Sequence, residues 1–573
     1  MKKNVLIVLV GIFISSRVFA LDHQPEQEIQ LKKSLVASAN SNYDSMDVFG
    51  IMTFLMQYSD LSKKWNYELV GLSWNEMSEA IYGSPDNVLS KLSYLFTWKE
   101  INNSKVLQKL NLNSKSFSGV FEGKYFKNLE YLSCSSNKFN DLILTSNNKL
   151  KELNCSNNLI NKLNITKNTN LVYLNCSKNL LENLDLTKNY YLKELNCNNN
   201  KLNTIDVFKN VNLTVLSCDN NFLNNLDVYR NFNLKELSCS NNQLSNVNVY
   251  YNSSLIKLSC GYNKLTTLNV TKNIKLENLL CYNNQIKSID VTNNENLKEL
   301  IIYNNQLKDL DLTYNVNLIT LYCSSNQLSK LDVSKNSKLR NLYCHYNQLT
   351  SLNISNNSNL DILYAYYNQL KFSTLQGNFL KIKDNYINPQ SIIKGGTKGF
   401  LELIDLSSEY IINGKKTSFV WLDRATNKKV NIFASNGMFY AGPENIGRTL
   451  ICYMENDFIP GFKQEYEVTI SNSMILTAKN MNASIPEGFK MVGVNEDLLN
   501  SFHVSPNPFI DNLKINTSSK VQSADIYNFS GKKVKRIPII NNNIINLEDL
   551  IAGAYFIIFK TDQGFVSKKI VKK

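Results

Sequence analysis

The chain has 573 residues, of which 43% are hydrophobic and 19% charged, with 21 Gly and 9 Pro. This composition excludes collagen-like, low-complexity and broadly disordered proteins, and at about 150 residues per domain the length predicts several structural units. The formal charge of +14 is concentrated at the ends, because residues 1–20 carry +3 and residues 499–573 carry +6. The body retains only +5, so we expect no nucleic-acid partner.

The first residues have the features of an export signal. Lys2 and Lys3 precede an apolar run over residues 5–14, and Val18 and Ala20 place small residues where a signal peptidase reads the chain. We therefore predict a cleaved secretory signal over residues 1–20. No later run of about 20 apolar residues follows, so no membrane-spanning segment is expected.

Residues 21–106 are predicted to form a small helical N-terminal cap. Val48, Ile51 and Leu55 recur at helical spacing, and Ser-Trp-Asn-Glu at residues 73–76 has the form of a capping box that begins a second helix. An independent binding domain is the alternative. A repeat protein needs a cap over its first exposed core face, and this favours the cap.

A 21-residue repeat runs from Leu129 to Asn378. One copy, over residues 150–168, reads Leu-Lys-Glu-Leu-Asn-Cys-Ser-Asn-Asn-Leu-Ile-Asn-Lys-Leu-Asn-Ile-Thr-Lys-Asn. Leu occupies the first and fourth positions of all twelve copies, which keep register without an insertion or deletion, and a looser copy at residues 107–112 precedes them. A fixed period of this length predicts a solenoid, with one short strand per turn stacked into a parallel sheet.

Two columns of asparagine recur in the repeat, from Asn137 to Asn368 and from Asn147 to Asn378. An asparagine side chain both donates and accepts hydrogen bonds, so the columns are expected to satisfy turn amides where the strands end. This pattern resembles the short bacterial type of leucine-rich repeat over residues 107–390. The resemblance implies a curved solenoid that binds proteins or other ligands on its strand face.

Ten of the eleven cysteines lie on the repeat grid: Cys134, Cys155, Cys176, Cys197, Cys218, Cys239, Cys260, Cys281, Cys323 and Cys344. The grid positions without cysteine hold Ile302 and Ala365, which are apolar. Neighbouring side chains about 4.8 Å apart also exceed the usual Cβ separation of a disulfide. We predict free, buried thiols rather than a disulfide or metal ladder.

A column of acidic residues also follows the repeat: Asp185, Asp206, Asp227, Asp290, Asp311 and Asp332. Calcium binding is one interpretation. Asn248, Asn269 and Asn353 interrupt the column, and no glycine-rich calcium turn accompanies it, so a solvated edge is favoured.

The two columns that flank the cysteines must face solvent on the sheet. In the first seven repeats they hold only small or polar residues, which offer no anchor for a ligand. In the last five repeats large residues replace them, and the predicted ligand-binding residues are Tyr282, Tyr303, Tyr322, Tyr343, His345, Tyr364 and Tyr366, with Tyr346 and Tyr367 at the edge. The alternative is that these rings stabilise neighbouring strands or are covered by an adjacent domain.

Short alternating runs separated by Asn413-Gly414 and Asn436-Gly437 turns predict a β-sandwich over residues 391–485, followed by a linker at 486–498. A buried-type Trp421 and Cys452 resemble those of an immunoglobulin-like domain, although Cys452 has no partner cysteine in this segment. The cap, repeats and sandwich together resemble the internalin architecture, which implies a sandwich that extends and stiffens the solenoid.

The last segment, residues 499–573, carries four motifs in order: Val-Ser-Pro-Asn-Pro-Phe at 504–509, Ile-Tyr-Asn-Phe-Ser-Gly-Lys-Lys-Val at 526–534, Leu-Ile-Ala-Gly-Ala-Tyr-Phe at 550–556 and Lys-Lys-Ile-Val-Lys-Lys at 568–573. From the residues alone this is a compact β-domain with a basic edge. The motifs resemble the type A sorting domain of the type IX secretion system. The resemblance implies a Gram-negative, Bacteroidetes-type cell, passage through the periplasm and outer membrane, and removal of the domain with surface attachment or release.

The sequence thus predicts an α/β-type leucine-rich-repeat solenoid, mostly strand and coil, with a helical N-terminal cap and two C-terminal β-sandwich domains. We expect a secreted or cell-surface, adhesin-like protein that recognises a protein ligand on its strand face and engages the type IX machinery through residues 499–573. A surface polysaccharide stacked on the same tyrosines is the alternative. The absence of Gly-x-Ser-x-Gly, His-Glu-x-x-His and phosphate-loop motifs, with only three scattered histidines, predicts no enzymatic activity, cofactor or metal.

Overall fold

The structure is a computed structural model of the chain. It describes residues 43–59, 61–82, 84–400, 402–471, 490–492, 502–528, 533–538, 543–562 and 564–573. The predicted export signal, the start of the cap and most of the predicted linker lie outside these residues. The chain divides into two compact units, Met1–Leu307 with Tyr314–Leu318, and Lys308–Thr313 with Ile319–Lys573. None of the helices in the described ranges has the length and apolar character needed to cross a membrane.

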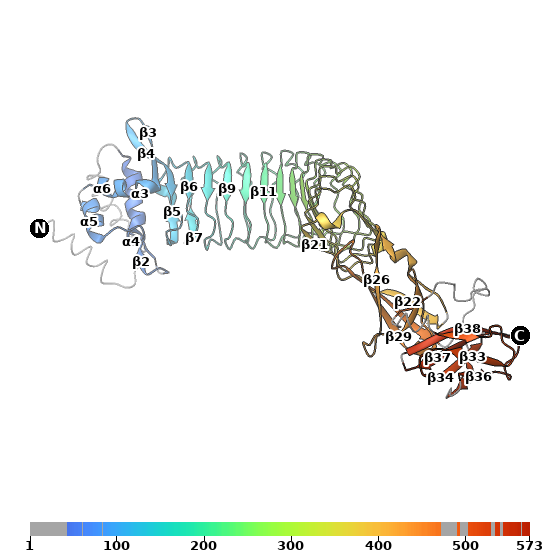
Figure 1. Cartoon of the computed structure of the whole chain (residues 1–573). Helices are drawn as coiled ribbons and strands as arrows, with labels where there is room; N and C mark the ends of the chain where they lie inside the picture. Colours follow the sequence, from blue (N-terminus) through green and yellow to red (C-terminus); the bar gives the residue numbers. More distant parts are fainter. Residues whose placement is uncertain are drawn as a thin grey trace. The chain divides into compact units, whose positions relative to one another are not determined.

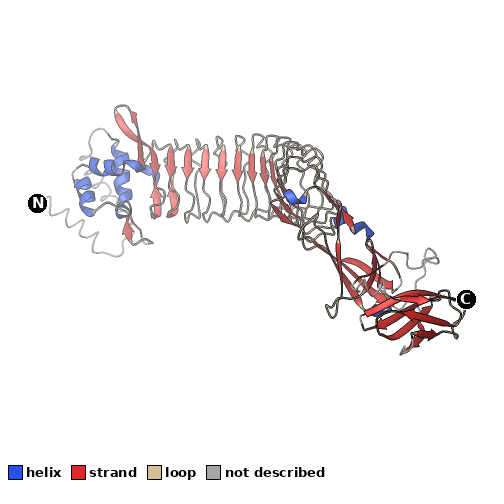
Figure 2. Ribbon diagram, viewed as in Figure 1, coloured by secondary structure: helices blue, strands red, loops and turns tan. Residues whose placement is uncertain are grey.

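The first unit begins with helices α3 (Ser45–Leu55), α4 (Asn66–Leu69), α5 (Trp74–Tyr82) and α6 (Asp86–Lys91), drawn in blue in Figure 2. The Asp44 carboxylate caps α3 by accepting the Met46 and Asp47 amides at 2.9 and 3.1 Å. At α5 the predicted capping box is present, because the Ser73 amide donates to Glu76 at 2.7 Å and the Glu76 amide donates to the Ser73 hydroxyl at 3.3 Å.

A carboxylate joins this cap to the first rung of the solenoid. Asp47 is 1% exposed and accepts the Leu107 amide at 2.7 Å, and burial raises the pKa of this carboxyl to about 7. Phe54 of the same helix packs edge-on against Phe117 at 4.9 Å between ring centroids. The N-terminal helices therefore cover the core of the first turns, as predicted.

Strands β3 (Phe96–Ile101) and β4 (Ser104–Asn111) form an antiparallel hairpin at the start of the solenoid. Asn102 and Asn103 connect them with φ values of 50° and 62°, the left-handed conformation that tight hairpins need. Because β4 pairs in parallel with the next strand, the looser copy at residues 107–112 is the first rung, and β3 occupies what would otherwise be an open edge.

Each further repeat of the first unit contributes one parallel strand of three residues. These strands lie side by side along the solenoid in Figure 1. In spatial order after β4 these are β6 (Tyr131–Ser133), β8 (Glu152–Asn154), β9 (Tyr173–Asn175), β10 (Glu194–Asn196), β11 (Val215–Ser217), β12 (Glu236–Ser238), β13 (Lys257–Ser259), β14 (Asn278–Leu280) and β15 (Glu299–Ile301). Leucine pairs with leucine between neighbours, as in Leu153 with Leu174. A separate pair, β5 (Ser118–Glu122) and β7 (Lys138–Ile143), lies within the first repeats.

The asparagine columns bond one repeat to the next, as predicted. Asn158 accepts the Phe139 amide at 3.0 Å and donates to the carbonyls of Cys134 and Cys155 at 2.9 and 3.0 Å. In the second column Asn168 donates to the Leu144 and Asn147 carbonyls at 3.0 and 2.8 Å. Buried backbone groups of each turn are thus satisfied by a side chain from the following repeat.

All eleven cysteines are free and buried. Burial raises the pKa of their thiols, to about 12 for Cys134 and Cys176, so the neutral form dominates at physiological pH. The ten cysteines of the repeats fill the core between the leucine columns as small apolar side chains, and Cys452 is buried in strand β29 of the sandwich.

In the second unit the repeat strands are β16 (Thr320–Tyr322), β17 (Asn341–Tyr343), β19 (Ile362–Tyr364) and β21 (Asp384–Tyr386), paired in that order, with β18 (Leu352–Asn353) beside β20 (Leu375–Gln376). The chain then forms two four-stranded sheets. One has the order β22 (Ile393–Gly399), β30 (Lys463–Ser471), β29 (Thr449–Glu455), β26 (Ser418–Asp423). The other is β23 (Ile404–Asp405), β28 (Met438–Tyr440), β27 (Ile432–Ser435), β31 (Lys490–Val492).

Trp421 occupies the core of these sheets, 3% exposed and 5.2 Å from the Phe439 ring. Asn413 and Asn436 adopt the positive φ expected of their turns. Strand β31 falls within the segment predicted as a linker, and its pairing with β27 places it in the second sheet.

The end of the solenoid in the second unit is bonded to the sandwich. Glu409 is 2% exposed and accepts the Ser373 amide at 2.9 Å and the Ser373 hydroxyl, while Gln464 accepts the Phe372 amide at 3.2 Å. The Phe372 ring packs on Phe462 at 4.6 Å. Polar and apolar contacts thus fix the sandwich to the last repeats.

The C-terminal segment forms a three-stranded and a four-stranded sheet. The first contains β32 (His503–Ser505), β33 (Asn512–Asn516) and β36 (Ile544–Asn546). The second contains β35 (Lys533–Ile537), β34 (Val521–Asn528), β37 (Gly553–Thr561) and β38 (Gly564–Lys572). Its core includes Phe502, Phe509 and Phe559, each 0% exposed. The predicted fold class is therefore confirmed, from the helical cap to the C-terminal sheets.

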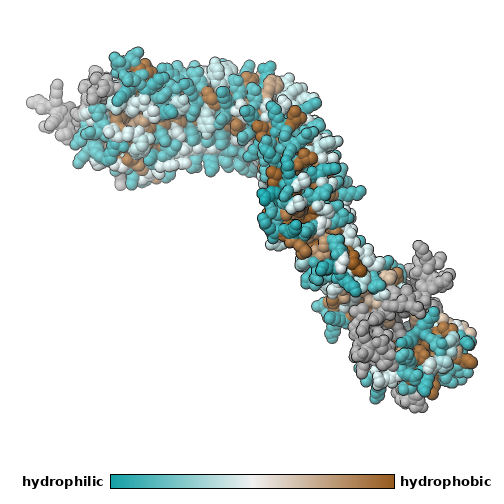
Figure 3. Space-filling model, turned by 45° about the horizontal axis from the view of Figure 1, so that its top comes forward, coloured by the Kyte–Doolittle hydropathy of each residue, from teal (hydrophilic) through white to brown (hydrophobic). Residues whose placement is uncertain are grey.

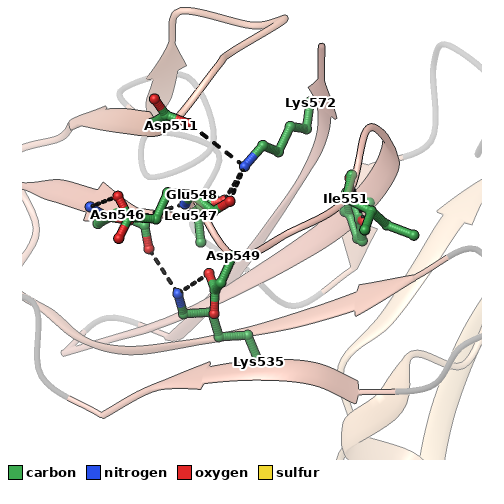
Figure 4. Close-up of polar contacts among 9 residues, drawn as sticks. Asp511, Lys535, Asn546, Leu547, Glu548, Asp549, Ile551 and Lys572 are labelled. Carbon is green, nitrogen blue, oxygen red and sulfur yellow. Dashed lines mark hydrogen bonds and ion pairs between the residues drawn. The ribbon is translucent and has the colours of Figure 1, made fainter.

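The first and last sequence motifs of this segment meet in space. Asn507 donates to the Lys569 carbonyl and accepts the Val571 amide, both at 2.8 Å. Lys572, 7% exposed, donates to the Leu547 and Glu548 carbonyls at 2.7 Å, as Figure 4 shows. The basic final strand is consequently held in the domain by specific polar contacts.

Candidate ligand-binding face

The predicted binding residues of the first unit, Tyr282 and Tyr303, project from one column of the sheet because they follow the buried cysteine position by one residue. Their rings stack at 4.9 Å with 14° between planes, and Tyr262 meets Tyr282 edge-on at 5.4 Å. Burial against one another raises the pKa of the Tyr282 and Tyr303 hydroxyls.

The predicted residues of the second unit form two groups. In the column before the cysteine, Tyr343 lies between Tyr322 at 3.8 Å and Tyr364 at 4.9 Å. The Tyr364 hydroxyl donates to Asp384 at 3.0 Å, and burial together with this carboxylate raises its pKa to about 12.

In the column after the cysteine, His345 stacks on Tyr366 at 4.4 Å, and burial lowers the pKa of the imidazole. All seven predicted residues are half-buried by their neighbours. Each unit therefore presents a cluster of tyrosine edges and hydroxyl groups.

Three exposed tyrosines border these clusters. Tyr262, Tyr346 and Tyr367 are 54%, 49% and 46% exposed and have φ values of 51°, 53° and 52°. The same position in the other nine repeats holds Ser, Asn or Lys, all with positive φ. Left-handed backbone favours asparagine and disfavours a bulky ring, so these tyrosines occupy positions where stability would select another residue. Sequence analysis noted Tyr346 and Tyr367 but missed Tyr262.

A hollow of about 510 Å³ lies on the strand face of the first unit, lined by Asp219, Asn220, Ser238, Ser240, Asn241, Ser259, Tyr262 and Tyr282. Most of its lining comes from the first seven repeats, whose small and polar columns were expected to offer no anchor for a ligand. Asp219 is the one acidic residue in the two flanking columns, which is the signal that could have revealed it.

Sequence analysis also missed a row of exposed apolar side chains at the turns that precede the strands of the first unit. The row consists of Tyr190, Tyr191, Phe208, Val211, Tyr229, Phe232, Tyr250, Tyr251 and Ile274, each at least 41% exposed. Figure 3 shows that the surface is mostly hydrophilic, with scattered hydrophobic residues. Four of these rings contact one another, since Tyr229 meets Phe232 and Tyr251, and Tyr251 meets Tyr250. The row lies in the turns and not in the strand columns of the predicted binding residues.

The acidic column has a local role in these turns. Asp227 accepts the Tyr229 amide at 2.9 Å, and Asn248 accepts the Tyr250 amide at 3.1 Å in the same way. Asparagine and aspartate make the same hydrogen bond in this turn. The turn bond therefore explains why either residue occurs in the column, without a metal ion. Within the residues that the structure describes, no three His, Cys, Asp or Glu side chains are grouped to hold one.

Comparison with known proteins agrees with this geometry. Residues 503–573 match the family model described as a secretion system C-terminal sorting domain. The functional domain of InlJ from Listeria monocytogenes, described as including a cysteine ladder, is 27% identical, with a TM-score of 0.50 over 61% of this chain and 82% of that one.

Two further structures are similar over the solenoid. A leucine-rich-repeat protein from Leptospira interrogans is 27% identical over 47% of this chain and 74% of that one, with a TM-score of 0.43. YopM, a leucine-rich effector protein from Yersinia pestis, is 22% identical over 49% and 83%, with a TM-score of 0.42. No curated protein sequence matches the chain.

The resemblances to a bacterial leucine-rich-repeat protein and to a secretion sorting domain are thereby confirmed. The repeats form the solenoid that their register predicts, with InlJ as a structural neighbour, and the C-terminal motifs fall within the matched sorting domain. A sorting domain of this kind marks a secreted, cell-surface protein of Bacteroidetes-type bacteria. The chain contains a solenoid of leucine-rich repeats that is similar in structure to an internalin, and its C-terminal residues 503–573 match a secretion system sorting domain.

Proposed function

We propose that the exported protein acts as an adhesin-like binding protein, and that the tyrosine clusters on its strand face recognise a protein ligand. Export through the periplasm and engagement of the type IX machinery by residues 499–573 belong to the same proposal. The protein acts by binding, without catalysis or a cofactor. In this proposal the exported chain consists of the cap, the solenoid, an immunoglobulin-like sandwich at residues 391–485 and the C-terminal sorting domain.

The observation that supports this proposal most strongly is the placement of Tyr262, Tyr346 and Tyr367. A non-glycine residue with positive φ costs of order 1–3 kcal/mol when its side chain is bulky. These rings are about half exposed, so each forgoes about half of the burial that a core position would give, although Tyr346 and Tyr367 stack on each other at 4.6 Å. A stabilising role for the clusters would not require them, whereas a binding surface gains large, stiff contact area at its border.

The geometry of the rings favours a protein ligand over a polysaccharide. Sugar binding by stacking needs free aromatic faces. The facing sides of Tyr282 and Tyr303 are occupied by each other, at 14° between planes, and His345 and Tyr366 are stacked at 17°. These two stacked pairs therefore offer ring edges and hydroxyl groups, which suit the mixed polar and apolar surface of a protein.

The test is binding of the purified full chain to immobilised collagen, fibronectin and laminin, run beside a glycan array. The variant Tyr322→Ala/Tyr343→Ala/Tyr364→Ala should lose at least tenfold in affinity for the matrix protein bound by the wild type. The matched control, Tyr190→Ala/Phe232→Ala/Tyr251→Ala, removes exposed rings from the turns and should bind as the wild type does. Equal binding by both variants would refute the tyrosine face, and recognition confined to the glycan array would favour the polysaccharide.

A further inference from the structure

The hollow on the strand face of the first unit is built from four consecutive repeats. In the column after the cysteine these repeats supply Asp219, Ser240, Gly261 and Tyr282. Asp219 forms one end and the Tyr282 ring forms the other. The hollow thus combines one carboxylate, several hydroxyl groups and an aromatic wall within about 510 Å³.

The aromatic wall depends on the glycine. A Cβ atom on Gly261 would lie 2.8 Å from Cζ of Tyr282 and 2.9 Å from both Cε atoms, closer than real Cβ contacts come. The Tyr282 ring therefore lies directly over the backbone of the preceding repeat, a position that a side chain at residue 261 would block. Tyr262 contacts the ring edge-on at 5.4 Å and closes the side of the hollow.

The carboxylate of Asp219 is held by neutral donors. Its Oδ1 accepts the Ser238 hydroxyl at 2.7 Å and the Ser240 amide at 2.6 Å. Among the described side chains, no lysine, arginine or histidine nitrogen lies within ion-pair distance of it, and Lys257 acts on it only at longer range. Partial burial raises the pKa of this carboxyl, and the hydrogen bonds from Ser238 and Ser240 oppose that shift.

We infer that this hollow binds a cationic side chain, the ammonium of lysine or the guanidinium of arginine, presented by the protein ligand. The cation would supply the counter-charge that Asp219 lacks, and its aliphatic stem would lie against the Tyr262 and Tyr282 side chains. The inference rests on the proposed function, because it makes the hollow a subsite of the same strand face. An anionic group would be repelled by Asp219, and a divalent cation would find only one carboxylate.

The experiment uses the full chain and small probes. Saturation-transfer difference NMR would measure binding of N-acetyl-arginine amide and N-acetyl-lysine amide, with N-acetyl-glutamine amide as the neutral comparison. We expect binding of at least one cationic probe and at least tenfold weaker binding of the neutral one. The two cationic probes distinguish a guanidinium from an ammonium subsite.

Two variants test the residues. Asp219→Asn keeps an acceptor for Ser238 and Ser240 but removes the negative charge. Tyr282→Ala removes the aromatic wall. Each variant should bind the cationic probe about tenfold more weakly, or worse, than the wild type does. The control Asp206→Asn changes an exposed aspartate whose turn bond asparagine makes elsewhere in the column, and it should bind as the wild type does. Unchanged binding in Asp219→Asn, or equal binding of the neutral probe, would overturn the inference.

The subsite and the proposed function can fail separately. If the cationic probes do not bind while the Tyr322, Tyr343 and Tyr364 variant still loses its matrix protein, only the subsite is wrong. If a cationic probe binds in an Asp219-dependent way and no matrix protein is recognised, the subsite stands and the proposed ligand class is wrong.

Discussion

The carboxyl group of Asp47 gives the N-terminal cap a pH dependence. Its pKa is raised from 3.8 to about 7 by burial, and Asp44 adds to the shift. In the unfolded chain the group loses its proton near pH 4, whereas in the folded chain it keeps the proton until about pH 7. Stability is therefore greatest at acidic pH and falls as the pH rises from about 4 to about 7.

Because of the Asp47 carboxyl, the free energy of unfolding of the cap should be about 1–4 kcal/mol lower at pH 8 than at pH 5. Hydrogen exchange of α3, measured at both pH values and corrected for intrinsic rates, reports the opening free energy locally. Glu444, whose pKa is also raised to about 7, acts in the same direction but in the sandwich, so a local probe separates the two. Asp47→Asn retains an acceptor for the Leu107 amide and should abolish the difference in α3; a persistent difference would contradict the assignment.

At the same scale, sequence alone could name the tyrosines but not the hollow beside them. The columns follow from the period of 21, so Tyr282 and Tyr303 can be assigned to one face without a structure. The hollow depends on the Tyr282 ring lying over Gly261, a side-chain orientation that the repeat pattern does not encode. Tyr262 was missed for a related reason, because its importance lies in a positive φ at a position that usually holds asparagine.

Among the elements, the asparagine column should set how strongly each repeat bonds to the next. Asn158→Ala removes an acceptor from the Phe139 amide and two donors from buried carbonyls, which should destabilise the surrounding repeats by about 2–3 kcal/mol. Urea unfolding with repeat-resolved hydrogen exchange measures the effect. The exposed Asn161→Ala in the next turn should change stability by less than about 0.5 kcal/mol. Equal losses in both variants would show that the column is not what links the repeats.

Strand positions in the solenoid could be predicted to within a residue because leucine, cysteine and asparagine repeat without a gap. The sandwich was harder. Its first strands are β22 at Ile393–Gly399 and β23 at Ile404–Asp405, which lie in different sheets. β22 contains Gly395, Gly396 and Gly399 with two lysines, so it lacks the apolar alternation on which strand prediction depends.

For the molecule as a whole, the final strand should decide whether the protein leaves the cell. Lys572→Ala leaves the Leu547 and Glu548 carbonyls without their buried donor and loosens β38. We expect a several-fold lower fraction of the protein at the cell surface and in the medium, with the remainder in the periplasm. Lys573→Ala, at an exposed position, is the matched control and should be exported normally. Normal export of the Lys572 variant in a domain shown to be loosened would mean that the machinery does not require a folded end.

The asparagine bonds between repeats have a consequence for how such a gene can change. Asn158 bonds to the repeat before it in the same way as Asn179 does, with matching donors and acceptors. Any repeat can therefore follow any other, and unequal recombination that duplicates or deletes 63 nucleotides, the coding length of about 21 residues, adds or removes one strand without a mismatch in the core. A lineage could lengthen its ligand-facing sheet, or import a new column of surface residues, in a single genetic event while the fold stays intact.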